Sequence, residues 1–285
     1  MPGDVLEELL SLLDVEPIEV NMFRGRSTDE SMQRVFGGQV AGQALVAAAR
    51  TVDEPDRSVH SLHAYFLRPG DPTKPILYDV DRLRDGRSFT TRRVMAIQHG
   101  RAIFNLHASF HIGETGLDFQ ESMPPDLPDP DGLADWKTRM EPHREALGPS
   151  WDRPRPIDIR YIRDDPMSRA GVTASGQQVW LRAAGSLPDD DVVHACVVTY
   201  ASDMTLLDTT LLPFGLGWND TGIQMASLDH AMWFHRPFRA DEWLLYDQQA
   251  ISTSGARGLA RGEIYTRDGA LAVSVMQEGL VRVRR

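Results

Sequence analysis

The feature that most constrains this chain is the repetition of one sequence unit. Residues 65–69 (Tyr-Phe-Leu-Arg-Pro) correspond to residues 233–237 (Trp-Phe-His-Arg-Pro), and a Tyr-Asp pair follows each stretch, at Tyr78 and at Tyr246. The Arg-Pro and Tyr-Asp pairs both recur at an offset of 168 residues. Units of roughly 110–130 residues are too long for a solenoid repeat, so the sequence predicts two copies of one domain.

A different composition separates the two copies. Between Pro124 and Pro156 lie eight of the 18 prolines of the chain, with aspartates between them. Such polar, Pro-rich sequence is typical of a linker with at most a short helix. We therefore expect an N-terminal unit over 1–113, a linker over 114–156 and a C-terminal unit over 157–285.

Each copy has the pattern of a buried helix followed by antiparallel strands. The stretch 37–50 is rich in Ala and nearly free of charge, which favours a helix that is buried on most sides and packed closely through its glycines. The stretch 101–112 alternates apolar and polar residues, as a half-buried antiparallel strand does. In the second copy, the aspartates at 189–191 begin a helix that we expect to run to about Leu212. Strands are expected after it, at 226–234, 243–252, 257–266 and 270–278. One helix wrapped by an antiparallel sheet, twice over, is an α+β architecture.

Alignment of the last strands on Gly100 and Gly269 places a polar residue at an apolar position. With this offset of 169 residues, Gln277 matches Ala108 on the inward face of the strand. A buried amide without hydrogen-bond partners costs roughly 1–3 kcal/mol. Gln277 therefore either has polar partners inside the unit or lies at a strand end that reaches water.

Two acids pose a similar question on the second helix. Asp203 and Asp208 both have mostly apolar residues at their helical-neighbour spacings. An ionised carboxylate on such a face must be paired or have its pKa raised. Spacing alone does not choose between the two acids, and a place on the exposed flank of the helix would explain either.

Other catalytic patterns are excluded. In the segment 227–230 (Ser-Leu-Asp-His), Asp229 and His230 are neighbours on a strand and point to opposite faces, so they cannot converge as a triad does. The sequence contains no nucleophile elbow, zinc-protease motif, dinucleotide fingerprint or P-loop. The histidines form no convincing metal pair. The single cysteine, Cys196, allows neither an intrachain disulfide nor a cysteine zinc site, and it fits a reducing compartment.

Charge and hydropathy exclude further classes of protein. The chain has 41 acidic and 30 basic residues and a net charge of −11, so we expect no nucleic-acid partner. No apolar run approaches the ~18 residues of a membrane span, so we expect no stable membrane insertion. The acidic first residues do not resemble a signal peptide, and we expect a cytoplasmic protein.

Several longer motifs, in matching order, resemble the acyl-CoA thioesterase II (TesB-like) family. They cover nearly the whole chain outside the Pro-rich middle. These motifs are residues 34–40 (RVFGGQV), 59–70 (VHSLHAYFLRPG), 200–203 (YASD), 228–237 (LDHAMWFHRP), 254–258 (SGARG) and 277–279 (QEG).

The resemblance implies a double hot-dog fold, in which each unit is a long helix wrapped by an antiparallel sheet and the two sheets join edge to edge. It also implies hydrolysis of acyl-CoA to free fatty acid and CoA, without a metal or other cofactor. The family uses an Asp, a Thr or Ser, and a Gln that hold and polarise a water. These fall on Asp203, Ser227 and Gln277, so the resemblance selects Asp203 over Asp208. Many relatives carry Thr at the position of Ser227, and the missing methyl group affects rotamer rigidity and hence rate.

As a mechanism we expect Asp203 to act as general base while Ser227 and Gln277 orient the water. A backbone N–H near a helix start would stabilise the oxyanion, and Gly38 is a candidate. One alternative is a catalytically silent acyl-CoA-binding protein, against which the intact trio argues. Another is a hydratase-type enzyme acting on enoyl-CoA, which would need a converging His/Asp pair. Exposed sheet edges or faces favour a homo-oligomer, either a dimer or a tetramer.

Overall fold

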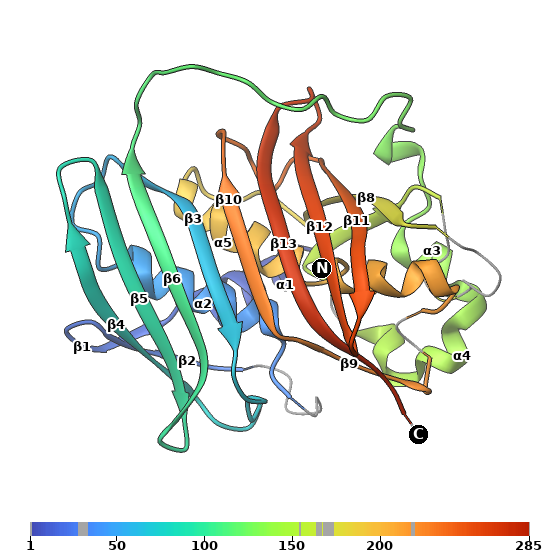
Figure 1. Cartoon of the computed structure of the whole chain (residues 1–285), viewed down its shortest axis with the longest axis horizontal. Coiled ribbons are helices and arrows are strands. Elements are labelled where there is room, and N and C mark those ends of the chain that lie inside the picture. Colours follow the sequence, from blue (N-terminus) through green and yellow to red (C-terminus); the bar gives the residue numbers. More distant parts are fainter. Residues whose placement is uncertain are drawn as a thin grey trace.

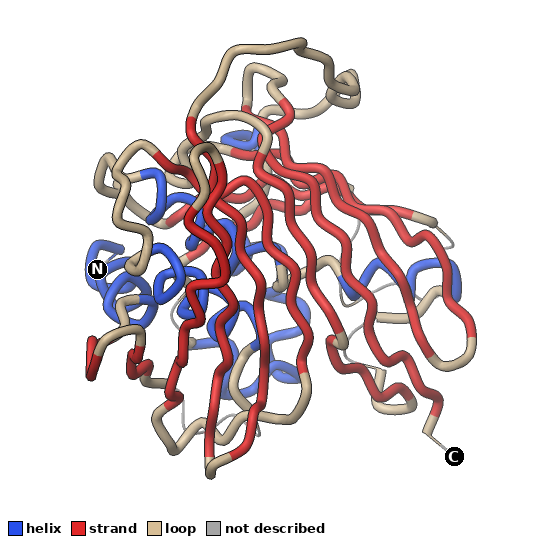
Figure 2. The backbone as a smooth tube through the Cα atoms, turned by 60° about the vertical axis from the view of Figure 1, so that its left-hand side comes forward, coloured by secondary structure: helices blue, strands red, loops and turns tan. Residues whose placement is uncertain are grey.

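One continuous sheet organises the whole molecule. The computed structural model describes residues 2–27, 34–153, 155–163, 167, 174–217 and 220–284, and within these ranges 13 strands form a single antiparallel sheet (Figure 1). The sheet curves around the long helices, which gather behind it when the molecule is turned (Figure 2). Strands with one apolar face need such a layer to bury that face.

The N-terminal half of the sheet is built around one long helix. Its elements are α1 (Pro2–Leu13), β1 (Glu16–Glu19), β2 (Met22–Gly25), α2 (Gly37–Ala49), β3 (Arg57–Phe66), β4 (Ile76–Asp85), β5 (Phe89–Gln98) and β6 (Arg101–Ile112). The C-terminal half repeats this plan. Its elements are β7 (Ile157–Tyr161), β8 (Gly176–Ala183), α5 (Asp191–Ser202), a 3-10 helix (Leu207–Phe214), β9 (Ile223–Ser227), β10 (Asp229–Phe234), β11 (Leu244–Ser254), β12 (Arg257–Thr266) and β13 (Leu271–Val283).

The two halves are related by a local two-fold axis at the seam, which is the pairing of β3 with β10. The strand order is β2-β4-β5-β6-β3 on one side and β10-β13-β12-β11-β8 on the other. His63 pairs with Ala231 across the seam. These two residues are repeat counterparts at the offset of 168, so a local two-fold axis passes between them. The expected edge-to-edge joining of two repeated units is confirmed.

Glycines let the two long helices pack closely, as the sequence predicts. A Cβ atom added to Gly38 of α2 would lie 2.4 Å from the backbone oxygen of Tyr200 in α5. A Cβ atom on Gly42, one turn further along α2, would lie 3.4 Å from the oxygen of Cys196. The approach at Gly38 is possible only where the side chain is a hydrogen atom, whereas the distance at Gly42 is that of an ordinary contact.

The helix expected to run to Leu212 ends ten residues earlier than predicted. α5 stops at Ser202, a short turn follows, and the chain continues as the 3-10 helix. Gln177 of β8 donates to the Thr205 carbonyl at 3.0 Å, and Gln248 of β11 donates to the Thr205 hydroxyl at 2.6 Å. These bonds tie the turn after α5 to the sheet.

The linker has more structure than expected. It contains two short α-helices, α3 (Trp136–Met140) and α4 (Arg144–Leu147), with 3-10 turns around them. The side chain of Asp135 caps α3, and the buried side chains of Met140, Leu147 and Trp151 form a small core of their own. The prediction of at most one short helix was therefore wrong, because the prolines occupy helix starts and turns, where they are tolerated.

The first part of the linker runs as an extended strap past the ends of the strands, from β6 to the C-terminal half (Figure 1). It is fixed to the C-terminal half, since Gln120 donates to the Gly269 carbonyl at 2.8 Å and accepts from the Leu271 N–H at 3.0 Å. In the part of the chain described here, no helix is long and apolar enough to cross a membrane.

Candidate active site

Asp203 lies where the end of α5 meets the start of α2. It is the residue that caps α5, with φ −81° and ψ −4°. A Cβ atom on Gly37 would lie only 2.6 Å from Asp203 Oδ2, so the carboxylate approaches the start of α2 through a gap that only glycine leaves. The backbone N–H of Gly38 donates to this carboxylate. The sequence suggested Gly38 as an oxyanion donor, but in the structure its N–H binds the acid instead.

Ser227 and Gln277 converge on the same carboxylate from two paired strands. Gln277, on β13, is fully buried and donates through Nε2 to Asp203 Oδ1 at 2.5 Å and to Ser227 Oγ at 3.1 Å. Ser227, the last residue of β9, donates to Asp203 Oδ1 at 3.3 Å. The three residues selected from the sequence are thus in mutual contact, and the inward position of Gln277 is confirmed.

The environment of Asp203 alters its acidity. Burial raises the pKa of this carboxyl from its ordinary 3.8 to about 6. Hydrogen bonds from Gln277, Gly38 and Ser227, and the positive charge of Arg34, act in the opposite direction. Burial prevails, and the group titrates close to neutrality, as a general base should.

A cavity of about 410 Å³ opens onto Asp203 and Ser227. Its deep walls are apolar and its rim carries Arg34 and Arg68. Asp208 lines the same cavity. The deep apolar walls come from both halves of the chain and include Val40, Phe66, Ile103, Phe104 and Leu207.

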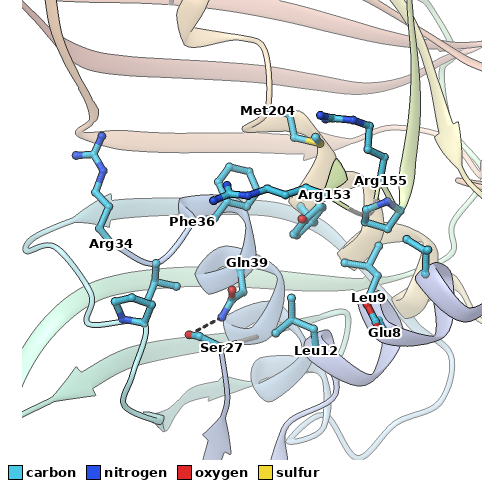
Figure 3. A pocket seen from close by; sticks show the side chains of 15 residues that line it. Glu8, Leu9, Leu12, Ser27, Arg34, Phe36, Gln39, Arg153, Arg155 and Met204 are labelled. Carbon is cyan, nitrogen blue, oxygen red and sulfur yellow. Dashed lines mark hydrogen bonds between the residues drawn. The ribbon is translucent and has the colours of Figure 1, made fainter. Parts of the chain in front are cut away.

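A second cavity has a volume of about 360 Å³, and Figure 3 shows the side chains that line it. The two share Arg34, Val35 and Phe36 as wall residues. Arg34 lies at one side of the second cavity and Arg155 at the opposite side (Figure 3). The guanidinium group of Arg155 lies over the ring of Trp136, 3.1 Å from its centre, so this cation is held by the linker.

A buried polar layer supports the turn that carries Asp203, and the sequence reading missed it. The Tyr246 hydroxyl donates to the Ser202 carbonyl at 3.2 Å, and Gln248 holds Thr205. His230 contacts the Ser202 hydroxyl at 2.8 Å. A signal was present in the repeat, because Gln248 occupies the position of Val80 in the first copy.

The excluded triad is absent from this site. Asp229 accepts from the Glu278 N–H at 2.7 Å, while His230 is buried against Ser202. Their partners lie in different directions, as the alternation of the strand predicts. Among the described residues, no group of three or more His, Cys, Asp or Glu side chains is placed to hold a metal ion.

In the first copy, the buried side chain of Arg92 occupies the place that corresponds to this site. In β12 and β13, Ala260 pairs with Gln277, whereas in β5 and β6 Arg92 pairs with Ala108. Arg92 is fully buried and donates to the hydroxyl and carbonyl of Thr51, just beyond α2, at 2.8 and 2.9 Å. The long polar side chain is Gln277 on β13 in the second copy and Arg92 on β5, the counterpart of β12, in the first. In the first copy this side chain is bound to Thr51.

Fold and site together define a double hot-dog protein with a polar centre where its two units meet. A family model described as acyl-CoA thioesterase matches residues 158–280, and one described as the acyl-CoA thioesterase N-terminal domain matches residues 27–111. The chain is 42% identical to acyl-coenzyme A thioesterase 8 of Homo sapiens, over 99% of this chain and 92% of that protein. It is 39% identical to acyl-CoA thioesterase 2 of Haemophilus influenzae, over 98% and 99% of the two chains.

Among solved structures, the acyl-CoA thioesterase II TesB2 of Mycobacterium marinum superimposes with a TM-score of 0.81 at 46% identity, covering 97% of this chain and 98% of that one. The chain therefore belongs to the acyl-CoA thioesterase II (TesB-like) family.

Proposed function

We propose that this chain hydrolyses acyl-CoA thioesters to a free fatty acid and CoA. The observation that carries the proposal is the Asp203 carboxylate, which titrates near neutrality, accepts from Gln277 at 2.5 Å and opens onto an apolar cavity. The names of the similar proteins from Homo sapiens and Haemophilus influenzae support the same reaction.

In the proposed reaction Asp203 acts as general base on a water. It takes one proton while the water oxygen attacks the thioester carbon. The tetrahedral adduct then collapses with breakage of the C–S bond, and Asp203 returns the proton to the departing thiolate. Ser227 and Gln277 orient the water beside the base. The buried Oε1 of Gln277 accepts no hydrogen bond from the described residues, so it can accept one from that water. Gly38 holds the carboxylate in place through its N–H.

Thiol release from a panel of short to long acyl-CoA thioesters tests this proposal. We expect activity in the wild type and a decrease of about 10²–10⁴-fold in Asp203→Asn, the usual effect of a lost general base. Asp208→Asn is the matched control, because Asp208 lines the same cavity, and it should stay close to wild type. Equal losses in the two variants would contradict the assignment. Binding of acyl-CoA without any thiol release would favour the silent binding protein instead.

We also propose that the protein acts in the cytoplasm as a homo-oligomer, a dimer or a tetramer. The outermost strands β1 and β7 each have one neighbour in the described sheet, and a second copy could pair with such edges. Sedimentation at several concentrations tests the oligomeric state, and a monomer at every concentration would contradict it.

A further inference from the structure

Two arginines at the mouth of the cavity, Arg34 and Arg68, are not assigned a role in the proposed reaction. Arg34 and Arg68 are both exposed and both line the cavity that contains Asp203. We propose that Arg34 and Arg68 bind the phosphate groups of the CoA part of the substrate. This inference rests on the proposed thioesterase function and assigns the part of the site that recognises the carrier instead of the acyl chain.

The repeat supports an anion site at Arg68. Arg68 Nη1 donates to the Ala102 carbonyl at 2.6 Å, and its repeat counterpart Arg236 donates through Nη1 to the Leu271 carbonyl at 3.1 Å. The same guanidinium group is thus anchored in the same way in both copies. In the second copy, Arg236 Nη2 also pairs with the carboxylate of Asp118, from the linker strap.

Within the described residues, Arg68 lacks the carboxylate partner that Arg236 has. In that part of the chain no carboxylate lies within ion-pair distance of Arg68, and the one hydrogen bond of its side chain there is the one from Nη1 to the Ala102 carbonyl. A guanidinium group with one anchored nitrogen and a second donor edge is well suited to a phosphate oxygen. The carboxylate on Arg236 therefore indicates what kind of group belongs on Arg68.

Arg34 supplies the second cation. Its Nη2 donates to the Met225 carbonyl of β9 at 3.0 Å, which holds the side chain beside the strand that ends at Ser227. Its charge also lowers the pKa of Asp203, so it lies close to the reacting centre. In the described part of the chain, Arg34 is not within ion-pair distance of a carboxylate, although its charge acts on Asp203. Arg155, across the second cavity, is held by Trp136 and is less suited to this task.

The overall negative charge of the protein is consistent with a role for cations at the mouth of the cavity. The chain has a net charge of −11, and CoA is itself strongly anionic through its phosphates. The mean field of the protein therefore opposes the approach of the substrate. Two arginines at the mouth of the cavity place positive charge where the proposed phosphate site lies, and this contribution should weaken as salt screens it.

Two substrates with the same acyl group separate this role from the chemistry. Acyl-CoA carries the phosphates, while the acyl-pantetheine thioester has the same thioester and arm without them. At pH 8, where Asp203 is ionised in every variant, we expect Arg34→Gln and Arg68→Gln each to raise KM for acyl-CoA about tenfold. We expect kcat to stay the same, and kcat/KM for acyl-pantetheine to change less than about twofold. The salt dependence of kcat/KM for acyl-CoA should also become shallower in both variants.

The matched control is Arg236→Gln, which removes the repeat counterpart whose anion is Asp118. It should leave both substrates unaffected. Equal losses with acyl-CoA and acyl-pantetheine in the Arg34 and Arg68 variants would overturn the inference, and so would unchanged kinetics with acyl-CoA. If the wild type hydrolyses neither substrate, the proposed function fails, and calorimetric titration with CoA itself decides the inference: weaker CoA binding in both variants supports it, and equal binding overturns it.

Discussion

Asp203 combines two properties that oppose each other, because burial disfavours its charge while catalysis as proposed requires it. Its carboxylate contacts donors from α2, β9 and β13, and its pKa still lies at about 6. Only the ionised form can take a proton from water. The activity of the protein should therefore depend on pH in a direction that the geometry determines.

We expect kcat/KM for acyl-CoA hydrolysis to rise with pH through an inflection near 6 and to level off above it. In Ser227→Ala the inflection should move to higher pH, since the hydrogen bond from Ser227 lowers the pKa of Asp203. A pH–rate profile of both proteins checks this. A profile that is flat between pH 5 and 8, or an inflection that moves downward in the variant, would contradict Asp203 as the base.

The raised pKa also predicts a pH-dependent difference in stability. In the unfolded chain the carboxyl titrates near its ordinary 3.8, and in the folded protein at about 6. The folded state thus keeps a proton that the unfolded state loses, and the stability associated with it is present below pH 4 and lost as the pH rises through 6. The amide of Asp203→Asn carries no such penalty.

Denaturant unfolding at pH 4 and pH 7 measures this difference. The free energy of unfolding of Asp203→Asn, minus that of the wild type, should increase from pH 4 to pH 7 by up to roughly 3 kcal/mol, which corresponds to a shift of about two pKa units. A difference that stays constant between the two pH values would show that burial does not perturb the acid.

The site residues could be predicted from the sequence in two ways. The repeat alone marked Gln277 as a polar residue at an inward position, and the family resemblance chose Asp203 and Ser227. The contact between Gly38 and Asp203 was not predictable, because more than 160 positions separate the residues. It depends on how closely α2 and α5 pack, which neither helix specifies by itself.

At the scale of elements, the end of α5 is what presents the acid. A continuous helix to Leu212 would have kept Asp203 in a regular turn, but β8 and β11 bind Thr205 and end the helix before it. The apolar pattern continues through the break, so the sequence predicted one helix. Tertiary hydrogen bonds from distant strands decided the boundary, and local periodicity does not report them.

The close packing of α2 on α5 gives a testable prediction at this scale. Gly38→Ala would place a Cβ atom 2.4 Å from the Tyr200 backbone oxygen, which cannot move without the helix. We expect this variant to be destabilised by about 1–3 kcal/mol, as measured by denaturant unfolding.

Gly42→Ala is the matched control on the same face of α2. Its added Cβ atom meets the end of the Leu13 side chain at 2.7 Å, which can shift, and lies 3.4 Å from the Cys196 oxygen. The higher helix propensity of Ala, worth about 1 kcal/mol, offsets part of the cost. If both variants lose the same stability, the distance between the helix backbones does not explain the glycines.

At the scale of the whole molecule, the repeat predicted the mirrored sheet but not the structure of the linker. Strand alternation and the offset of 168 residues were enough to expect two units joined edge to edge. The linker was read as mostly unstructured, because its small core of Met140, Leu147 and Trp151 involves too few residues to produce a periodic pattern. The division into segments 1–113, 114–156 and 157–285 stays a prediction.

Limited proteolysis tests that division. Leu117 and Phe119 in the strap are the most exposed large apolar side chains of the described chain, so we expect cleavage to begin near them. The two fragments should stay together and keep thioesterase activity, because β3 pairs with β10 and the site takes groups from both α2 and β13. Gel filtration and thiol release of the cut protein measure both properties. Separation into two folded but inactive fragments would contradict the expectation that the pairing of β3 with β10 holds the two units together.

Joining both copies in one gene has freed them to evolve apart. In a symmetric homodimer every substitution appears twice, so an arginine such as Arg92 would close both centres at once. In this chain Arg92 fills only the first copy, while the facing positions of the second hold Ala260 and Gln277. Selection can therefore favour a stabilising residue in one half and a reactive residue at the equivalent position in the other. Two identical subunits encoded by one gene cannot differ in this way.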